Sequence, residues 1–216
     1  MRQKERHHLK QNELAFGLHK LVDFGKRYGR PLAVLGIVLV ALVLVYAGFQ
    51  VVRALANKKD SKVISEVLKL RSELPKNPGN LTKLESYKGK AGRLAEVLVA
   101  TYWVEQGDLD KAEDSANKVK GSPKDSTYYQ AQSLLAQIYY WRKNYDKAIE
   151  IYKAILADNP KDYPQDGVMY HQAEALEKKG QKAEALTLYK KLQTDYAQTY
   201  FGYEAQQKVA SLGVAK

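Results

Sequence analysis

The chain has 216 residues, a formal net charge of +11 and no cysteine, which excludes disulfides, thiolate metal sites and a cysteine nucleophile. Residues 1–53 contain nine Lys and Arg against three acidic residues, whereas residues 54–216 contain 26 against 21. The basic excess is therefore densest near the amino terminus. A basic segment beside an apolar helix is attracted to anionic lipid headgroups, so we expect contact with membrane lipid and no nucleic acid partner.

Residues 1–30 form a basic, partly amphipathic tail. Leu14, Leu18, Leu21 and Val22 share one face at helical spacing, which is typical of a short helix lying along headgroups. The pair His7 and His8 lacks further ligands at a suitable spacing, so we interpret both as solvated.

Residues 31–53 are predicted to form a transmembrane helix. No charged side chain occurs from Leu32 to Phe49, and eleven residues from Leu32 to Val45 are Leu, Ile or Val. At about −0.3 to −0.6 kcal/mol each, these favour insertion by roughly 3 to 7 kcal/mol. A core helix in so small a domain would need a polar stripe. A cleaved signal peptide would have a shorter leader and a shorter apolar run. We therefore expect an uncleaved anchor.

The orientation of this helix does not follow from charge. Basic residues flank both ends, for example Lys26 and Arg30 before it and Arg53 and Lys58 after it. The positive-inside rule counts short loops, and long domains cross the membrane largely regardless of charge. Both orientations therefore remain open from the charges.

The remaining sequence contains an internal repeat, preceded over residues 54–92 by an irregular helical lead-in with helices expected at 61–74 and 80–90. Key alanines are spaced 36 and 37 residues apart: Ala112, Ala148 and Ala185. Four residues after them come Ala116, Tyr152 and Tyr189, and twelve residues before them come Ala100, Ala136 and Ala173. Small residues at these positions let two helices pack closely, and stacked pairs bury a core that one pair cannot.

We therefore predict an all-α fold, in which one transmembrane helix precedes an α-solenoid of helix pairs. The repeats and a carboxyl-terminal capping helix occupy residues 93–216. Ile149, Tyr152 and Ile155 form an apolar stripe on the second helix of the central pair. Pro160 follows this stripe and ends the helix.

These residues resemble the tetratricopeptide (TPR) repeat. Its features are most complete in the central repeat, in Ala136, Tyr139, Ala148, Tyr152 and Pro160. The repeat around Ala112 has Ala116 where an aromatic is usual, and the repeat around Ala185 lacks a closing proline.

The full layout is also similar to the YfgM-like family of bacterial inner-membrane proteins. This resemblance implies a cytoplasmic amino terminus, a periplasmic carboxyl-terminal domain, and the SecYEG translocon or periplasmic chaperones as protein partners.

The sequence indicates no catalytic site. It contains no phosphate-binding glycine loop, nucleophile elbow or His/Glu metal spacing. His171 is the one histidine of the repeat region, and a lone helical histidine is usually structural or solvated. We therefore expect no enzyme activity, no cofactor and no metal.

The TPR resemblance implies a partner-binding groove along the first helix of each pair. Its residues would be Val97, Thr101, Val104, Gln130, Ser133, Gln137, Tyr140, Trp141, Tyr170, Glu174 and Lys178. Tyr140 and Trp141 are the strongest candidates, because buried aromatics dominate binding hot spots. The alternative for Trp141 is packing against a neighbouring helix.

The leading functional hypothesis is a membrane-anchored TPR adaptor that binds a protein partner near the secretion machinery. The first alternative is a structural accessory subunit of a larger membrane complex. The second is a receptor whose TPR domain lies in the cytoplasm. The oligomeric state and the identity of the partner do not follow from the sequence.

Overall fold

The computed structural model describes residues 42, 44–50, 60–121 and 123–214. The chain divides into two compact units, Met1–Lys59 and Asp60–Lys216. In the first unit the described residues are helical and their side chains are exposed. The expected tail over residues 1–30 and most of the expected membrane helix over residues 31–53 lie outside the described residues. Among the helices that the structure describes, none combines the length and apolar character that a membrane span requires.

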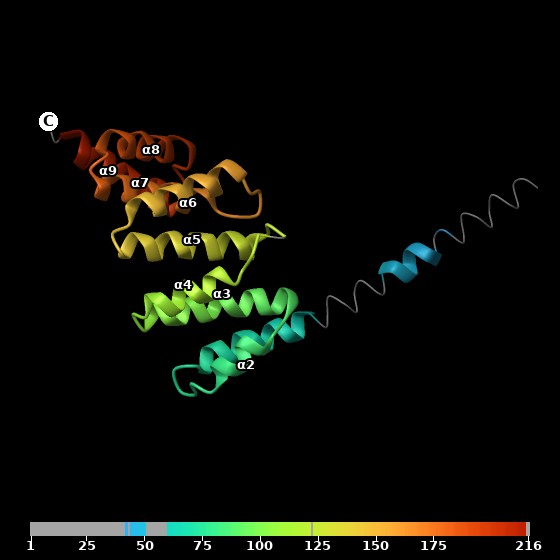
Figure 1. Ribbon diagram of the computed structural model, residues 1–216. Helices are drawn as coiled ribbons and strands as arrows, with labels where there is room; N and C mark the ends of the chain where they lie inside the picture. The colour runs from blue at the N-terminus through green and yellow to red at the C-terminus, as the bar shows by residue number, and fades with distance from the viewer. Residues whose placement is uncertain (1–41, 43, 51–59, 122, 215–216) are drawn as a thin grey trace, which may run out of the picture. The chain divides into compact units, whose positions relative to one another are not determined.

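The second unit consists of helices joined by short turns and loops (Figure 1). Its first helix covers residues 60–73. The helices that follow are α2 (Asn80–Ser86), α3 (Gly89–Glu105), α4 (Leu109–Asn117), α5 (Ser126–Trp141), α6 (Tyr145–Asp158), α7 (Gln165–Lys179), α8 (Lys182–Asp195) and α9 (Tyr200–Val214). The expected all-α fold of helix pairs is confirmed for this unit.

Three helix pairs stack in chain order: α3 with α4, α5 with α6, and α7 with α8 (Figure 1). The first helices of successive pairs contact one another, α3 with α5 and α5 with α7. At the carboxyl end α9 packs against both α7 and α8, and it covers the segment where we expected a capping helix. Each pair therefore contacts only its neighbours along the stack, as in repeat proteins generally.

The recurring alanines lie in the interior of the stacked helix pairs. All six have no exposed surface: Ala100, Ala112, Ala136, Ala148, Ala173 and Ala185. A side chain that ends at Cβ lets two helix axes come near the lower end of the usual packing distances. Tyr152 and Tyr189, one turn further along α6 and α8, are also buried. The spacing of the alanines in the sequence therefore predicted the positions at which the paired helices pack together.

Each pair turns at an equivalent residue that adopts a left-handed backbone conformation. The φ angles are 78° at Gly107, 61° at Lys143 and 91° at Gly180. Glycine adopts this conformation without a steric cost, whereas lysine does not. Asn144 then caps α6, since its side chain accepts a hydrogen bond from the backbone N–H of Lys147. The central pair therefore keeps the turn geometry although it lacks the turn glycine.

The lead-in differs from its expected boundaries. We expected its second helix to run over residues 80–90, but α2 ends at Ser86. Tyr87 is extended, and Gly89 has a φ of 62° at the start of α3. Two residues in non-helical conformations thus separate α2 from α3, where apolar periodicity alone gave no sign of a break.

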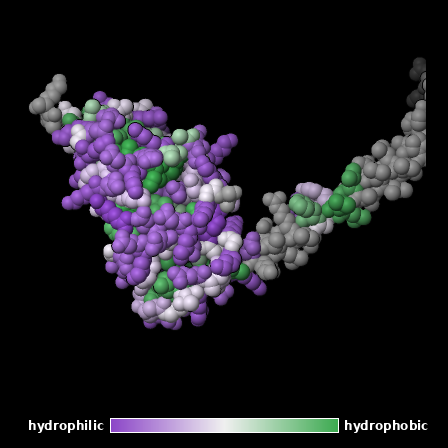
Figure 2. Space-filling model, viewed as in Figure 1, coloured by the Kyte–Doolittle hydropathy of each residue, from purple (hydrophilic) through white to green (hydrophobic). Residues whose placement is uncertain are grey.

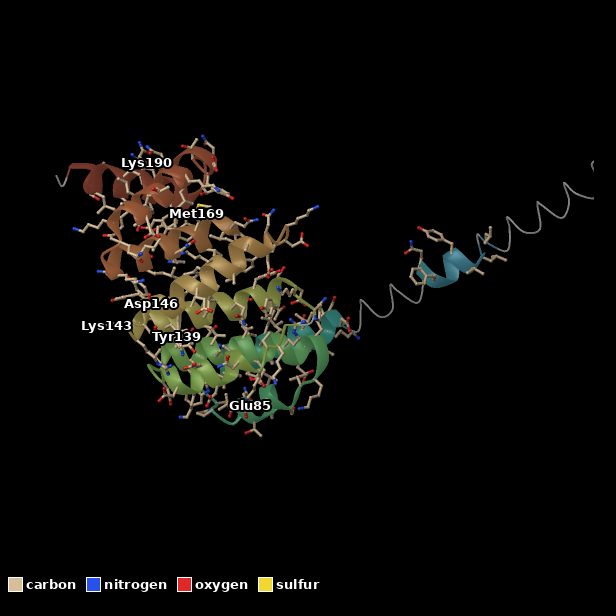
Figure 3. The ribbon with its side chains drawn as sticks, turned by 45° about the horizontal axis from the view of Figure 1, so that its top comes forward. Glu85, Tyr139, Lys143, Asp146, Met169 and Lys190 are labelled. Carbon is tan, nitrogen blue, oxygen red and sulfur yellow. The ribbon has the colours of Figure 1, made fainter. Side chains whose placement is uncertain are left out.

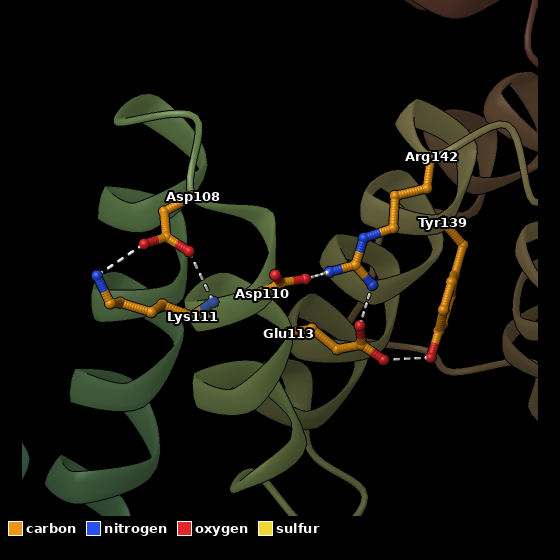
Figure 4. Close-up of polar contacts among 6 residues, drawn as sticks. All are labelled: Asp108, Asp110, Lys111, Glu113, Tyr139 and Arg142. Carbon is orange, nitrogen blue, oxygen red and sulfur yellow. Dashed lines mark hydrogen bonds and ion pairs between the residues drawn. The ribbon is translucent and has the colours of Figure 1, made fainter.

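A polar network joins the first pair to the second (Figure 4). Arg142, at the end of α5, forms ion pairs with Asp110 and Glu113 of α4. The Tyr139 hydroxyl donates a hydrogen bond to Glu113. Partial burial raises the pKa of the Glu113 carboxyl, but the bond from Tyr139 and the ion pair with Arg142 outweigh it, so the pKa lies below its usual value. Glu113 is therefore stabilised as the carboxylate.

An equivalent ion pair joins the second and third helix pairs. Lys179, at the end of α7, lies 2.5 Å from a carboxylate oxygen of Asp146 on α6. Asp110 and Asp146 each stand two residues before a key alanine. Figure 3 shows Asp146 at the same end of the domain as Tyr139 and Lys143. One cation from the end of a first helix thus contacts the second helix of the preceding pair at both junctions.

The turn at Lys143 predicts a stabilising substitution. We expect Lys143→Gly to raise the free energy of unfolding by about 1 kcal/mol, because glycine relieves the left-handed strain. The matched control is Lys153→Gly, an exposed site inside α6, which should lower it by about 1 kcal/mol. Urea unfolding of the full chain measures both. A loss of stability in Lys143→Gly would contradict the assigned role of the turn.

The network predicts a pH-dependent contribution from Glu113. The folded pKa is lowered, so the stabilisation is fully present above the unfolded pKa and is lost as the pH falls through the folded pKa. We expect Glu113→Gln to cost about 1–2 kcal/mol at neutral pH, and the cost to shrink below about pH 4. Urea unfolding over a pH series measures it. The control Asp114→Asn, exposed on the same helix, should change stability by under about 0.5 kcal/mol. A pH-independent cost in Glu113→Gln would refute the charge-based explanation.

Candidate functional site

A hollow of about 160 Å³ opens where three helices of the second and third pairs meet. Its lining comes from the end of α5 and the middle of α6 and α7, namely Gln137, Tyr140, Trp141, Tyr152, His171 and Glu174. Four of these six are among the residues that the sequence assigned to a groove. The structure therefore brings together the predicted residues of two neighbouring repeats.

The aromatic side chains of the hollow differ in their exposure to solvent. The exposed fraction is 45% for Trp141 but 1% for Tyr152. Tyr140 is half-buried and lies edge-on to Tyr145, with ring centroids 5.6 Å apart. Trp141 therefore stands at the surface, where a partner can cover it, whereas Tyr152 is fixed in the core.

His171 has more contacts than a solvated side chain. Its Nδ1 lies 2.9 Å from Oε2 of Glu174, and its ring stacks on Tyr152 with centroids 6.3 Å apart and an interplanar angle of 28°. Phe201 of α9 approaches the same ring edge-on at 5.5 Å. The imidazole thus holds the Glu174 carboxyl in place, which a lone histidine in a sequence does not reveal. The spacing of three residues between His171 and Glu174 was the available signal.

Burial and carboxylates raise the pKa values of the tyrosines around the hollow. For Tyr140 the largest cause is burial, followed by the charge of Glu174. The same causes, in the same order, raise the pKa of Tyr152. For Tyr170 burial, Glu174 and Glu204 raise it to about 12. These phenols are therefore neutral at physiological pH, and the negative potential of Glu174 reaches all three.

The other predicted groove residues do not form one continuous surface. Val97, Ser133 and Tyr170 are buried, so their side chains belong to the interior. Thr101 and Val104 are partly buried, and the Thr101 hydroxyl donates to the backbone carbonyl of Val97 over 2.9 Å. Gln130 and Lys178 are exposed. The groove predicted from the TPR resemblance thus combines residues that face inward with residues that face outward.

The visible face of this unit is mainly polar. Figure 2 shows hydrophilic residues over most of the visible face of this unit, with hydrophobic residues in narrow areas between them. Small-molecule and cofactor sites usually enclose about 300–1,000 Å³, which is larger than this hollow. Within the described ranges, no group of three or more His, Cys, Asp or Glu side chains is placed to hold a metal ion. The hollow instead has the dimensions of one inserted side chain.

Comparisons with known proteins agree with this geometry. Two family models, both described as tetratricopeptide repeat, match residues 103–166 and 168–199. The matches run from the end of α3 into α7, and then over α7 and α8. No match was found among curated proteins. The chain thus contains tetratricopeptide repeats in an all-helical, TPR-like fold.

Two solved structures have a similar fold. They are the nearly identical TPR-like repeats of a Podosopora anserina protein assigned as a kinesin light chain, and a variant of the same repeats. Sequence identities are 17% and 16% and TM-scores 0.55 and 0.56, and each match covers 70% of this chain and 85% of that chain. TPR repeats are typically non-catalytic modules for protein–protein interaction. They indicate that this chain is an interaction scaffold.

Proposed function

We propose that the chain is a membrane-anchored TPR adaptor that binds a protein partner at the hollow between α5, α6 and α7. The observation that carries the proposal is the exposed Trp141 beside Tyr140 and the Glu174 carboxyl. Tryptophan and tyrosine are enriched among the residues that dominate binding energy. An exposed pair of such residues at a hollow, on a scaffold built for protein contacts, is best explained by a partner.

The anchor is supported by the sequence of residues 31–53, which contains an uncharged apolar run of sufficient length. A tether confines the domain to the membrane surface and raises its effective concentration near membrane partners. The overall resemblance to YfgM-like proteins favours a cytoplasmic amino terminus and a periplasmic domain. It also favours partners at the secretion translocon or among periplasmic chaperones.

The partner surface predicts a specific loss of binding. In the full chain, Tyr140→Ala combined with Trp141→Ala should reduce copurification of the partner by about thirtyfold, as expected for a hot spot of about 2 kcal/mol. Tyr203→Ala removes an aromatic of α9 that is more exposed than Trp141 and should leave copurification unchanged. Quantitative mass spectrometry measures the retained proteins, and circular dichroism checks that helicity is kept. Equal retention by both variants would rule out the hollow as the binding face. A retained protein in fixed stoichiometry with every variant would instead favour a structural subunit of a larger complex.

The anchor and its orientation predict a labelling pattern. Because the natural chain has no cysteine, a single Lys190→Cys substitution on the exposed face of α8 provides a unique thiol. In bacterial spheroplasts, a membrane-impermeant maleimide should label this thiol, whereas Lys10→Cys in the tail should react only after lysis. Protection of Lys190→Cys in intact spheroplasts would exclude a periplasmic domain.

A further inference from the structure

The Glu174 carboxylate gives the hollow a negative charge that is available to a partner. Within the described part of the chain, the polar partner of the Glu174 carboxylate is Nδ1 of His171, 2.9 Å away. Among the described residues, no lysine or arginine forms an ion pair with this carboxylate. Glu174 is partly buried, and a charge in such a place acts more strongly than one in bulk water. The hollow therefore favours a group with the opposite charge.

The nearby basic side chains have other partners. Arg142 forms ion pairs with Asp110 and Glu113, and Lys179 pairs with Asp146. Lys208 of α9 lies 2.9 Å from Glu177, one turn after Glu174 on α7. Lys178 is exposed and does not line the hollow. Arg142, Lys179 and Lys208 are thus paired with carboxylates that do not line the hollow, and its lining contains no lysine or arginine.

The remaining walls suit a cation with an apolar stem. Trp141 and Tyr140 line the hollow, and an aromatic ring attracts an ammonium or guanidinium group that lies over its face. Gln137 supplies an amide oxygen that accepts a hydrogen bond from such a group. A volume of about 160 Å³ is enough for one long side chain. Carboxylate, aromatic rings and amide together define a site for a basic residue.

We propose that the hollow lined by Trp141, Tyr140 and Glu174 binds the side chain of a single arginine or lysine from the partner protein. This inference rests on the proposed function and specifies the chemistry of the partner: a segment that presents one basic residue flanked by residues able to cover Trp141. The ammonium or guanidinium group pairs with Glu174, and the methylene stem lies against the aromatic rings.

The test uses short peptides selected from a displayed random library on the full chain in mild detergent. We expect the selected peptides to share one arginine or lysine. In a selected arginine peptide, replacing that residue by citrulline, which keeps the shape and removes the charge, should weaken binding about tenfold. Glu174→Gln should weaken binding of the arginine peptide by a similar factor and should barely affect the citrulline peptide. Fluorescence polarisation measures all four affinities.

The matched control is Asp195→Asn, which removes an exposed carboxylate at the end of α8 and should change neither affinity. The Glu174→Lys variant should not bind the selected peptides. Library selection on this variant should yield peptides with an acidic residue in place of the basic one. If Glu174→Gln weakens both peptides equally, the subsite is refuted. Peptides that need Tyr140 and Trp141 but no basic residue also refute the subsite and leave the proposed function standing. Peptides that bind equally well without Tyr140 and Trp141 refute the hollow as a binding face.

Discussion

The close crossing of paired helices is the constraint on which the rest of this domain depends. Ala136 and Ala148, from α5 and α6, have no exposed surface, and their small side chains let the two helices of the central pair approach closely. Equivalent alanines do the same in the pairs before and after it. Because every pair is built alike, successive first helices lie next to one another, and α5 contacts α7. The hollow forms where the end of α5 meets α6 and the middle of α7.

The sequence predicted the part of the fold that repeats. Alanines at fixed spacing, with Tyr152 and Tyr189 one turn later, located the crossings, because a packed helix interface limits side-chain size at particular positions. Boundaries that depend on a few backbone angles were harder to predict. Gly89 and Tyr87 break the helix of the lead-in, and Lys143 adopts a turn conformation that a glycine usually signals.

The sequence predicted only part of the candidate site. The TPR resemblance assigned Tyr140, Trp141 and Glu174 to a groove, and the hollow includes all three. Tyr152 was interpreted as a core residue, which it is, but one part of its ring also lines the hollow. His171 was interpreted as structural or solvated. Its contact with Glu174 depends on a rotamer, and rotamers do not follow from residue spacing. A site formed between repeats requires the geometry of the stack.

The dependence of each pair on its neighbours links the site to local unfolding. Contacts along the stack join adjacent pairs only, so the terminal elements of such an array can detach without melting the centre. The hollow takes His171 and Glu174 from α7. The elements that follow α7 in the stack are α8 and α9, which both contact it. Joint detachment of α7, α8 and α9 would separate the α7 wall of the hollow from the wall formed by α5 and α6. A ligand bound there must therefore hold the end of the array closed, and its binding free energy adds to the local stability of α7, α8 and α9.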